Sequence, residues 1–375
     1  MLPHLVGVSL LAAGTATGVF CHLRHIGLTV LVLLAPLPGL ALVLPFLPFW
    51  ALTGLRLVLI AYAMSLGAGL LLAGEYAQRV CEGAESRAAV VGAYRRHGLA
   101  LGAVSLAAAG CLALAGLTGG VWPPALSAAA LAAAANGTAL VAFYFARFLP
   151  CREDFVARSN RAGERWHRRA GWLTALAQPR WGYAIAGIAL VLAALGAFGA
   201  QPLTIAARAN NGVWFAFPPM AAAVLAALSV TLRDRRAILA TALSLPVPIL
   251  LGLWGLAKAG VALNPTSLLL LLFSVGAGMI GLFASRAAAG RCGDGVPVAA
   301  ASLLRRDGRN LFYTGAIPSL VLLLSVPVIG DIGAALAVAA GFTGTGALLF
   351  RPAFAAVIES WLPRVATPAS RYRLP

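Results

Sequence analysis

Negative charge is missing from the long apolar segments of this sequence. All eleven Asp and Glu residues lie at the ends of those segments or between them. Charged residues make up 10% of the 375 residues, hydrophobic residues make up 61%, and the mean hydropathy is +0.90. A soluble domain is about a quarter charged, so this composition excludes one. It predicts an all-α bundle that crosses a membrane many times.

Residue types that usually carry chemistry are also scarce. Most of the five cysteines lie near the face predicted to be cytoplasmic, so we expect no disulfide, and their spacing fits no metal site. The five histidines lie near or outside the predicted membrane boundaries. No carboxylate pair, histidine cluster or Ser–His–Asp set could meet at one depth of the membrane. We therefore expect no enzyme activity and no cofactor.

The basic residues are spread over short loops between the apolar segments. They form no contiguous face, which argues against nucleic acid as a partner despite a pI of 11.2. Of the 28 Lys and Arg residues, all but Arg56, Arg208 and Lys258 fall on one side of the membrane in the favoured topology. Loops rich in Lys and Arg stay in the cytoplasm. The sequence thus predicts an inner-membrane protein with its N-terminus outside and its C-terminus in the cytoplasm.

The apolar segments are long enough to span a bilayer as helices. About 20 residues cross a hydrocarbon core of ~30 Å. By that measure the sequence holds about eleven candidate spans. They are residues 5–20, 27–50, 55–74, 98–117, 122–149, 182–200, 213–232, 237–258, 264–286, 310–329 and 332–356.

Prolines interrupt two of these spans. The second contains Pro36, Pro38, Pro45 and Pro48, and the eighth contains Pro246 and Pro248. Each proline removes a backbone hydrogen bond, so we expect both helices to bend. The bends would serve helix packing or would border a wet cavity.

A short motif occurs twice and divides the chain into two halves. The stretch Ser65-Leu66-Gly67-Ala68-Gly69-Leu70-Leu71 is matched by Ser274-Val275-Gly276-Ala277-Gly278-Met279-Ile280, and Arg95-Arg96-His97-Gly98 by Arg305-Arg306-Asp307-Gly308. Two matches in register favour a duplication over chance recurrence in an Ala- and Gly-rich chain. The halves are residues 1–149, with five helices, and 182–358, with six; residues 150–181 link them, and 359–375 form a basic tail.

The repeated motif should lie at the centre of the bundle. Small residues at helical spacing let neighbouring helices approach closely in lipid. We expect the two motif helices to face each other across a pseudo-twofold axis, packing there or lining a substrate path. The candidate residues are Ser65, Gly67, Gly69, Leu70, Ser274, Gly276, Gly278 and Met279.

The linker between the halves has the pattern of an amphipathic surface helix. Phe155, Ala162, Trp166 and Leu173 recur on one face. The opposite face carries Arg158, Arg161, Arg165, Arg168 and Arg169. Such a helix lies on the inner leaflet, with Trp166 at headgroup depth and the arginines toward anionic membrane lipids. The alternative is a plain basic cytoplasmic linker.

The second motif resembles the resistance–nodulation–division (RND) superfamily, in particular its MMPL-like and predicted-exporter branches. The resemblance rests on the run from Gly276 through Gly281-Leu282-Phe283-Ala284-Ser285-Arg286, on the turn Leu263-Asn264-Pro265 before it, and on Arg305-Arg306-Asp307-Gly308 after it. It covers nearly the whole chain in the order of helices. It implies a membrane transporter of two similar halves.

Two departures from the RND pattern bear on function. RND proteins have a large extracytoplasmic domain after the first helix of each half. In the second half of this sequence we expect that domain to be reduced to residues 201–212. In the first half we expect both the domain and the helix before it to be missing. The intramembrane Asp of the family would fall at Met279, and by the internal repeat at Leu70. A proton relay needs a titrating group, so the resemblance implies a transporter that has lost its own proton coupling.

These observations leave two functions open. One is export or handling of a lipid or other hydrophobic compound, alone or with a second transporter subunit or periplasmic partner. The other is a non-transporting scaffold, a sensor or an accessory subunit of a split exporter. A lipid-sized cavity between the two motif helices would favour the first function, and a solidly packed interface would favour the second.

The predicted topology can be tested by cysteine labelling. Cysteines introduced in residues 201–212 should react with an impermeant thiol reagent from outside the cell, and cysteines in 287–300 only from the cytoplasmic side. The reason is that Lys- and Arg-rich loops remain in the cytoplasm. Labelling of both segments from the same side would refute the assignment.

Overall fold

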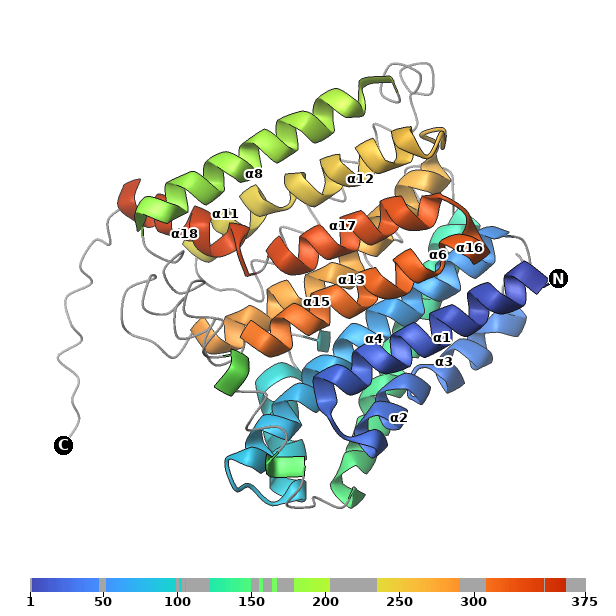
Figure 1. Ribbon diagram of the computed structural model, residues 1–375, viewed down its shortest axis with the longest axis vertical. Coiled ribbons are helices and arrows are strands. Elements are labelled where there is room, and N and C mark those ends of the chain that lie inside the picture. Colours follow the sequence, from blue (N-terminus) through green and yellow to red (C-terminus); the bar gives the residue numbers. More distant parts are fainter. Residues whose placement is uncertain are drawn as a thin grey trace.

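The computed structural model describes residues 2–46, 52–98, 101–102, 105, 122–149, 155–157, 164–166, 179–202, 235–289, 308–346 and 348–361. Those residues form helices joined by short turns, and none of them forms a strand. The long helices lie side by side with roughly parallel or antiparallel axes (Figure 1). The all-α bundle predicted from composition is confirmed.

Within the described residues, six segments are long and apolar enough to cross a membrane. They are Val6–Leu23, Ile26–Phe46, Thr53–Cys81, Pro124–Phe148, Arg180–Gly199 and Ile238–Lys258. Two shorter apolar helical segments, Thr266–Gly278 and Ile332–Gly344, lie in the second half. Most of the predicted spans 98–117 and 213–232 falls outside the described residues.

Helix α4 (Leu52–Cys81) runs through the middle of the bundle (Figure 1). It contacts α13 (Pro265–Ala289) and α15 (Gly308–Leu324), which also contact each other. Most of α4 is buried, as its sequence requires: apolar or small side chains occupy all sides of the helix from Leu57 to Ala73. A helix that is apolar all round belongs inside a bundle.

The same packing order occurs in both halves of the chain. In the first half, α6 (Trp122–Phe143) contacts α4 and also α3 (Leu37–Val43). In the second half, α17 (Ile332–Gly346) contacts α13 and also α12 (Pro246–Lys258). The two motif helices, α4 and α13, thus have corresponding neighbours. This arrangement is what two pseudo-symmetric halves predict.

Helices α1 (Leu2–Leu23) and α8 (Pro179–Gly199) lie at the edges of the bundle. A separate small core joins α8 to α11 (Arg235–Ser244), α12 and α18 (Phe350–Trp361) through residues such as Ala189, Val247 and Phe354. The outer side of α8 leaves Leu190, Val191 and Phe198 exposed. In a membrane protein an exposed apolar face of this kind faces lipid.

The proline-rich spans are broken, as predicted. The second span consists of α2 (Ile26–Leu34), α3 and the 3₁₀ helix η1 (Leu44–Phe46), with the first break at Ala35 and Pro36. The eighth consists of α11 and α12, which meet at Leu245. Tyr62 on α4 donates a hydrogen bond to the carbonyl oxygen of Leu33 beside the first break, at 3.1 Å. That break therefore borders protein, which supplies a partner for the backbone.

The last predicted span, 332–356, is two helices in the structure. Helix α17 ends at Gly346 and α18 begins at Phe350, with Pro352 in the first turn of α18. Proline is tolerated there because the first N–H groups of a helix have no partner within it. The two parts also have different neighbours, since α17 packs in the central bundle and α18 packs on α8 and α11.

Candidate functional site

The motif helices approach their neighbours at glycines. A Cβ atom on Gly69 would lie 3.2 Å from Val32 of α2. A Cβ atom on Gly278 would lie 2.4 Å from the carbonyl oxygen of Ala340 on α17. Only glycine permits that second contact, which brings two backbones together. Gly276 differs, because an added Cβ would meet no atom within 4 Å.

The polar residues of the motif are hydrogen-bonded inside the bundle. Ser65 is fully buried and donates to Asn136 Oδ1 of α6 at 2.9 Å, and Asn136 Nδ2 donates to Ser105 Oγ at 3.2 Å. Ser274 donates to the carbonyl oxygen of Leu271 at 2.7 Å. These bonds join helices or satisfy the hydroxyl locally. Each of these hydrogen bonds is consistent with a role in helix packing, which is the simpler alternative to lining a substrate path.

The two positions where the family resemblance places an acid are Leu70 and Met279. Leu70 is fully buried in the central core, together with Leu66, Leu71 and Gly67 of the same helix. The backbone of Met279 lies within α13, but its side chain lies outside the described residues. Leu70 therefore lies in a buried, apolar environment.

Asn310 at the start of α15 links three helices. Its Nδ2 donates to the carbonyl oxygen of Leu71 on α4 at 3.0 Å, and its Oδ1 lies 3.1 Å from Nε2 of His22 on α1. The absence of a side chain at Gly74 makes room, since a Cβ there would lie 2.1 Å from Asn310 Oδ1. The His22 ring also stacks on Tyr313 with centroids 4.6 Å apart. Asn310 thus fixes α1 and α15 against the C-terminal half of α4.

Glu75 on α4 is the centre of a buried ion cluster. Its carboxylate oxygens accept hydrogen bonds from Arg79 Nε at 2.8 Å and from Arg96 Nη1 at 2.9 and 3.1 Å. His97 Nε2 lies 3.5 Å away. Among the residues whose burial the structure describes, Glu75 is the only buried acidic side chain, with 2% exposed. The cluster ties α4 to the helical segment 86–98 that follows it.

Segment 86–98 has a second attachment, to α6. Tyr94 donates a hydrogen bond to the carbonyl oxygen of Leu140, and its ring packs edge-on against Phe143 with centroids 5.7 Å apart. Burial raises the pKa of Tyr94 to about 12, so its hydroxyl stays protonated as a donor at physiological pH. Together with the Glu75 cluster, this contact fixes the segment on two helices.

Sequence reasoning missed both Asn310 and the Glu75 cluster. It ended the third span at residue 74 and counted 75–97 as a loop, whereas α4 continues to Cys81 and residues 86–98 are helical. The spacing of Glu75 and Arg79, four residues apart, was the available local signal. Nothing local indicates that Arg96 and His97 return to the same carboxylate.

Two aromatic residues of the linker pack on the protein. Phe155 is buried and meets the His25 ring edge-on, with centroids 5.0 Å apart. Trp166 lies against Gly308 and 6.2 Å from the Phe312 ring. Arg165 is exposed. The other four arginines assigned to the surface helix, Arg158, Arg161, Arg168 and Arg169, lie outside the described residues, so the membrane-surface helix stays a prediction.

The fold is similar to that of SecDF. A crystal structure of SecDF in a super-membrane-facing form aligns with a TM-score of 0.71 at 11% identity over 96% of this chain. The structure of SecDF from Thermus thermophilus, described as a translocon-associated membrane protein, gives 0.66 at 14% identity over 96%. The chain spans 62% of the length of each. No family model and no curated protein matches the sequence.

At 11–14% identity the likeness to SecDF concerns the fold alone. The comparison therefore supports a SecDF-like helical membrane fold. The resemblance to the RND superfamily and to its MMPL-like branch stays a prediction.

The two glycines of the second motif allow a matched test of its packing role. We expect Gly278→Ala to lower the free energy of unfolding by about 1–3 kcal/mol, because the new methyl group would press on the Ala340 carbonyl. Gly276→Ala should leave stability unchanged or raise it by up to ~1 kcal/mol, since the site is open and alanine favours helix. Thermal unfolding of the purified protein in detergent would measure both. Equal effects would contradict the packing role.

The ion cluster can be tested in the same assay. We expect Glu75→Gln to destabilise the protein by about 3–5 kcal/mol, because Arg96 and His97 would stay buried beside a neutral group. Glu82→Gln removes an exposed carboxylate at the residue directly after α4 and should change stability by less than about 0.5 kcal/mol. A Glu75 variant as stable as the Glu82 variant would show that the cluster contributes little.

Proposed function

We propose that this chain is the membrane-embedded core of an RND-like translocation or export assembly, and that it acts beside a partner as an accessory subunit. The observation that carries the proposal is the SecDF-like arrangement of its helices over 96% of the chain. One such neighbour, SecDF from Thermus thermophilus, is a translocon-associated membrane protein. By this analogy the partner is a protein-conducting channel in the same membrane.

The packing of the central helices supports an accessory role over a substrate conduit. Between α13 and α17 the backbones meet at Gly278, and between α15 and α17 they meet where Gly315 faces Gly344. On α4, Leu66 and Leu70 are fully buried among apolar neighbours. A lipid-sized passage needs space between helices, and these contacts leave none where the backbones meet. Export of a lipid or other hydrophobic compound by the chain alone is the weaker reading.

The chemistry of the described core supports a role without its own proton coupling. Leu70 stands where the family resemblance places an acid. The buried Glu75 lies near the end of α4 and is engaged by two arginines, as a brace between helices requires. In the proposed role the driving force comes from the partner, because carrying protons across a bilayer needs a titrating group at depth.

Two measurements test this proposal. In the source organism, deletion of the gene should slow maturation of secreted precursor proteins in a pulse-chase experiment, and expression of the wild-type chain should restore the rate. A Gly278→Leu variant should restore it poorly because it separates α13 from α17, and Gly276→Ala should restore it fully. Membrane levels of both variants serve as the control for folding.

The second measurement asks whether the chain transports by itself. Vesicles that contain only this protein should show no flux of a fluorescent lipid that depends on a proton gradient, and an uncoupler should change nothing. Uncoupler-sensitive flux would contradict the proposal and reveal an overlooked relay group. Normal precursor maturation in the deletion strain, combined with altered lipid export, would favour the lipid-handling function instead.

A further inference from the structure

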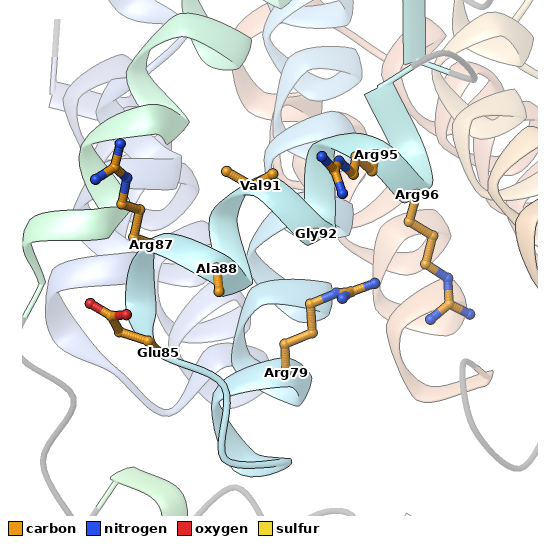
Figure 2. A pocket seen from close by; sticks show the side chains of 8 residues that line it. All are labelled: Arg79, Glu85, Arg87, Ala88, Val91, Gly92, Arg95 and Arg96. Atoms are coloured by element: carbon orange, nitrogen blue, oxygen red, sulfur yellow. The ribbon is translucent and has the colours of Figure 1, made fainter.

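A pocket of about 590 Å³ lies where α4 ends and the next helix begins. Arg79 of α4 contributes one wall, and Arg87, Val91, Gly92, Arg95 and Arg96 of segment 86–98 contribute most of the rest. Figure 2 shows the side chains of Arg79, Arg95 and Arg96 around Gly92, with Arg87 at the other end of the pocket. Neither the fold comparison nor the proposed function accounts for this cluster.

The arginines are held in place by the fold. Arg79 packs on segment 86–98 at Gly92, where a Cβ atom would lie 2.4 Å from Arg79 Nη1. Arg96 is buried, and its Nη1 is fixed on both oxygens of Glu75. Arg87 and Arg95 are exposed on the same segment, two helical turns apart. The pocket therefore combines two anchored guanidinium groups with two that can move toward a ligand.

The charge balance of the pocket favours an anion. Four arginines face two carboxylates, and Glu75 is already engaged by Arg79 and Arg96. The second carboxylate, Glu85, lies at the Arg87 end and weakens anion binding there. The excess of arginine over carboxylate groups is thus greatest around Gly92, away from Glu85. Planar guanidinium groups match the oxygens of a phosphate with paired hydrogen bonds.

The surroundings indicate a ligand at the membrane boundary. The pocket lies at the C-terminal end of α4, whose apolar span of 29 residues, Thr53–Cys81, exceeds the ~20 residues that cross a hydrocarbon core, so this end reaches the membrane boundary. Between the arginines the wall is apolar, and 41% of Val91 is exposed. Basic pockets at the cytoplasmic ends of membrane helices bind the headgroups of anionic lipids. We propose that this pocket binds a phosphate group, carried by an anionic phospholipid or present as free phosphate.

The test uses the full chain in nanodiscs of zwitterionic phosphatidylcholine. Short-chain phosphatidylglycerol is titrated in one arm and inorganic phosphate in the other, and binding is measured by calorimetry. We expect Arg95→Gln to weaken binding of the ligand about fivefold, as the loss of one basic residue near a phosphate implies, and Arg87→Gln/Arg95→Gln to weaken it further. Because both side chains are exposed, the variants should keep the wild-type melting temperature.

Arg180→Gln is the matched control, since it removes the same charge from the exposed start of α8, outside the pocket. It should bind like the wild type. Saturable binding of phosphatidylglycerol but not of phosphate, lost in the Arg95 variant, would identify a lipid site. Phosphate binding with the same dependence on Arg95 would identify a site for free phosphate. If neither probe binds, or if Arg180→Gln weakens binding as much as Arg95→Gln, the proposal is wrong. Failure of the pocket proposal would not affect the proposed translocation role, because that role does not depend on the pocket.

Discussion

Inside a bilayer no water can replace a missing hydrogen-bond partner, so the polar groups of these helices must find partners within the protein. Asn310 does this by binding Leu71 of α4 and His22 of α1, and Tyr62 does it at the first helix break. Such bonds form only between helices that lie very close together. Glycine supplies that closeness, as Gly74 does beside Asn310. The hydrogen bonds of Asn310 therefore depend on the small residue at Gly74, which lets the helices approach closely.

A different constraint applies to the charged residues near the C-terminal end of α4. Charges are tolerated there, but a buried carboxylate still needs cationic partners. Glu75 has them because the chain turns back after α4 and brings Arg96 alongside Arg79. The turn that neutralises Glu75 also collects more arginines than the carboxylates require. The proposed phosphate pocket is a consequence of that excess, so one local fold serves both stability and binding.

The likeness to SecDF places these features in a known fold. The chain shares the helical arrangement of those proteins while spanning 62% of their length, at 11–14% identity. Similarity of that kind preserves the order and contacts of helices without preserving individual side chains. In the proposed accessory role, backbone contacts such as Gly315 against Gly344 keep the core rigid, and exposed apolar faces such as that of α8 are available to lipid or to a membrane partner.

The sequence alone determined the class, the all-α architecture, the boundaries of most described spans and the breaks at Pro36 and Pro246. These depend on local properties: the length of an apolar run is set by bilayer thickness, and proline acts on its own helix. Only the tertiary structure decided that Glu75 lies in a buried cluster, that Asn310 joins three helices, and that α18 separates from α17 to pack on α8. Each of those outcomes depends on residues far apart in the chain meeting in space. The free energy of burying a polar group depends on its hydrogen-bond and ion-pair partners. The residue pattern along one segment does not reveal which distant residues those partners are.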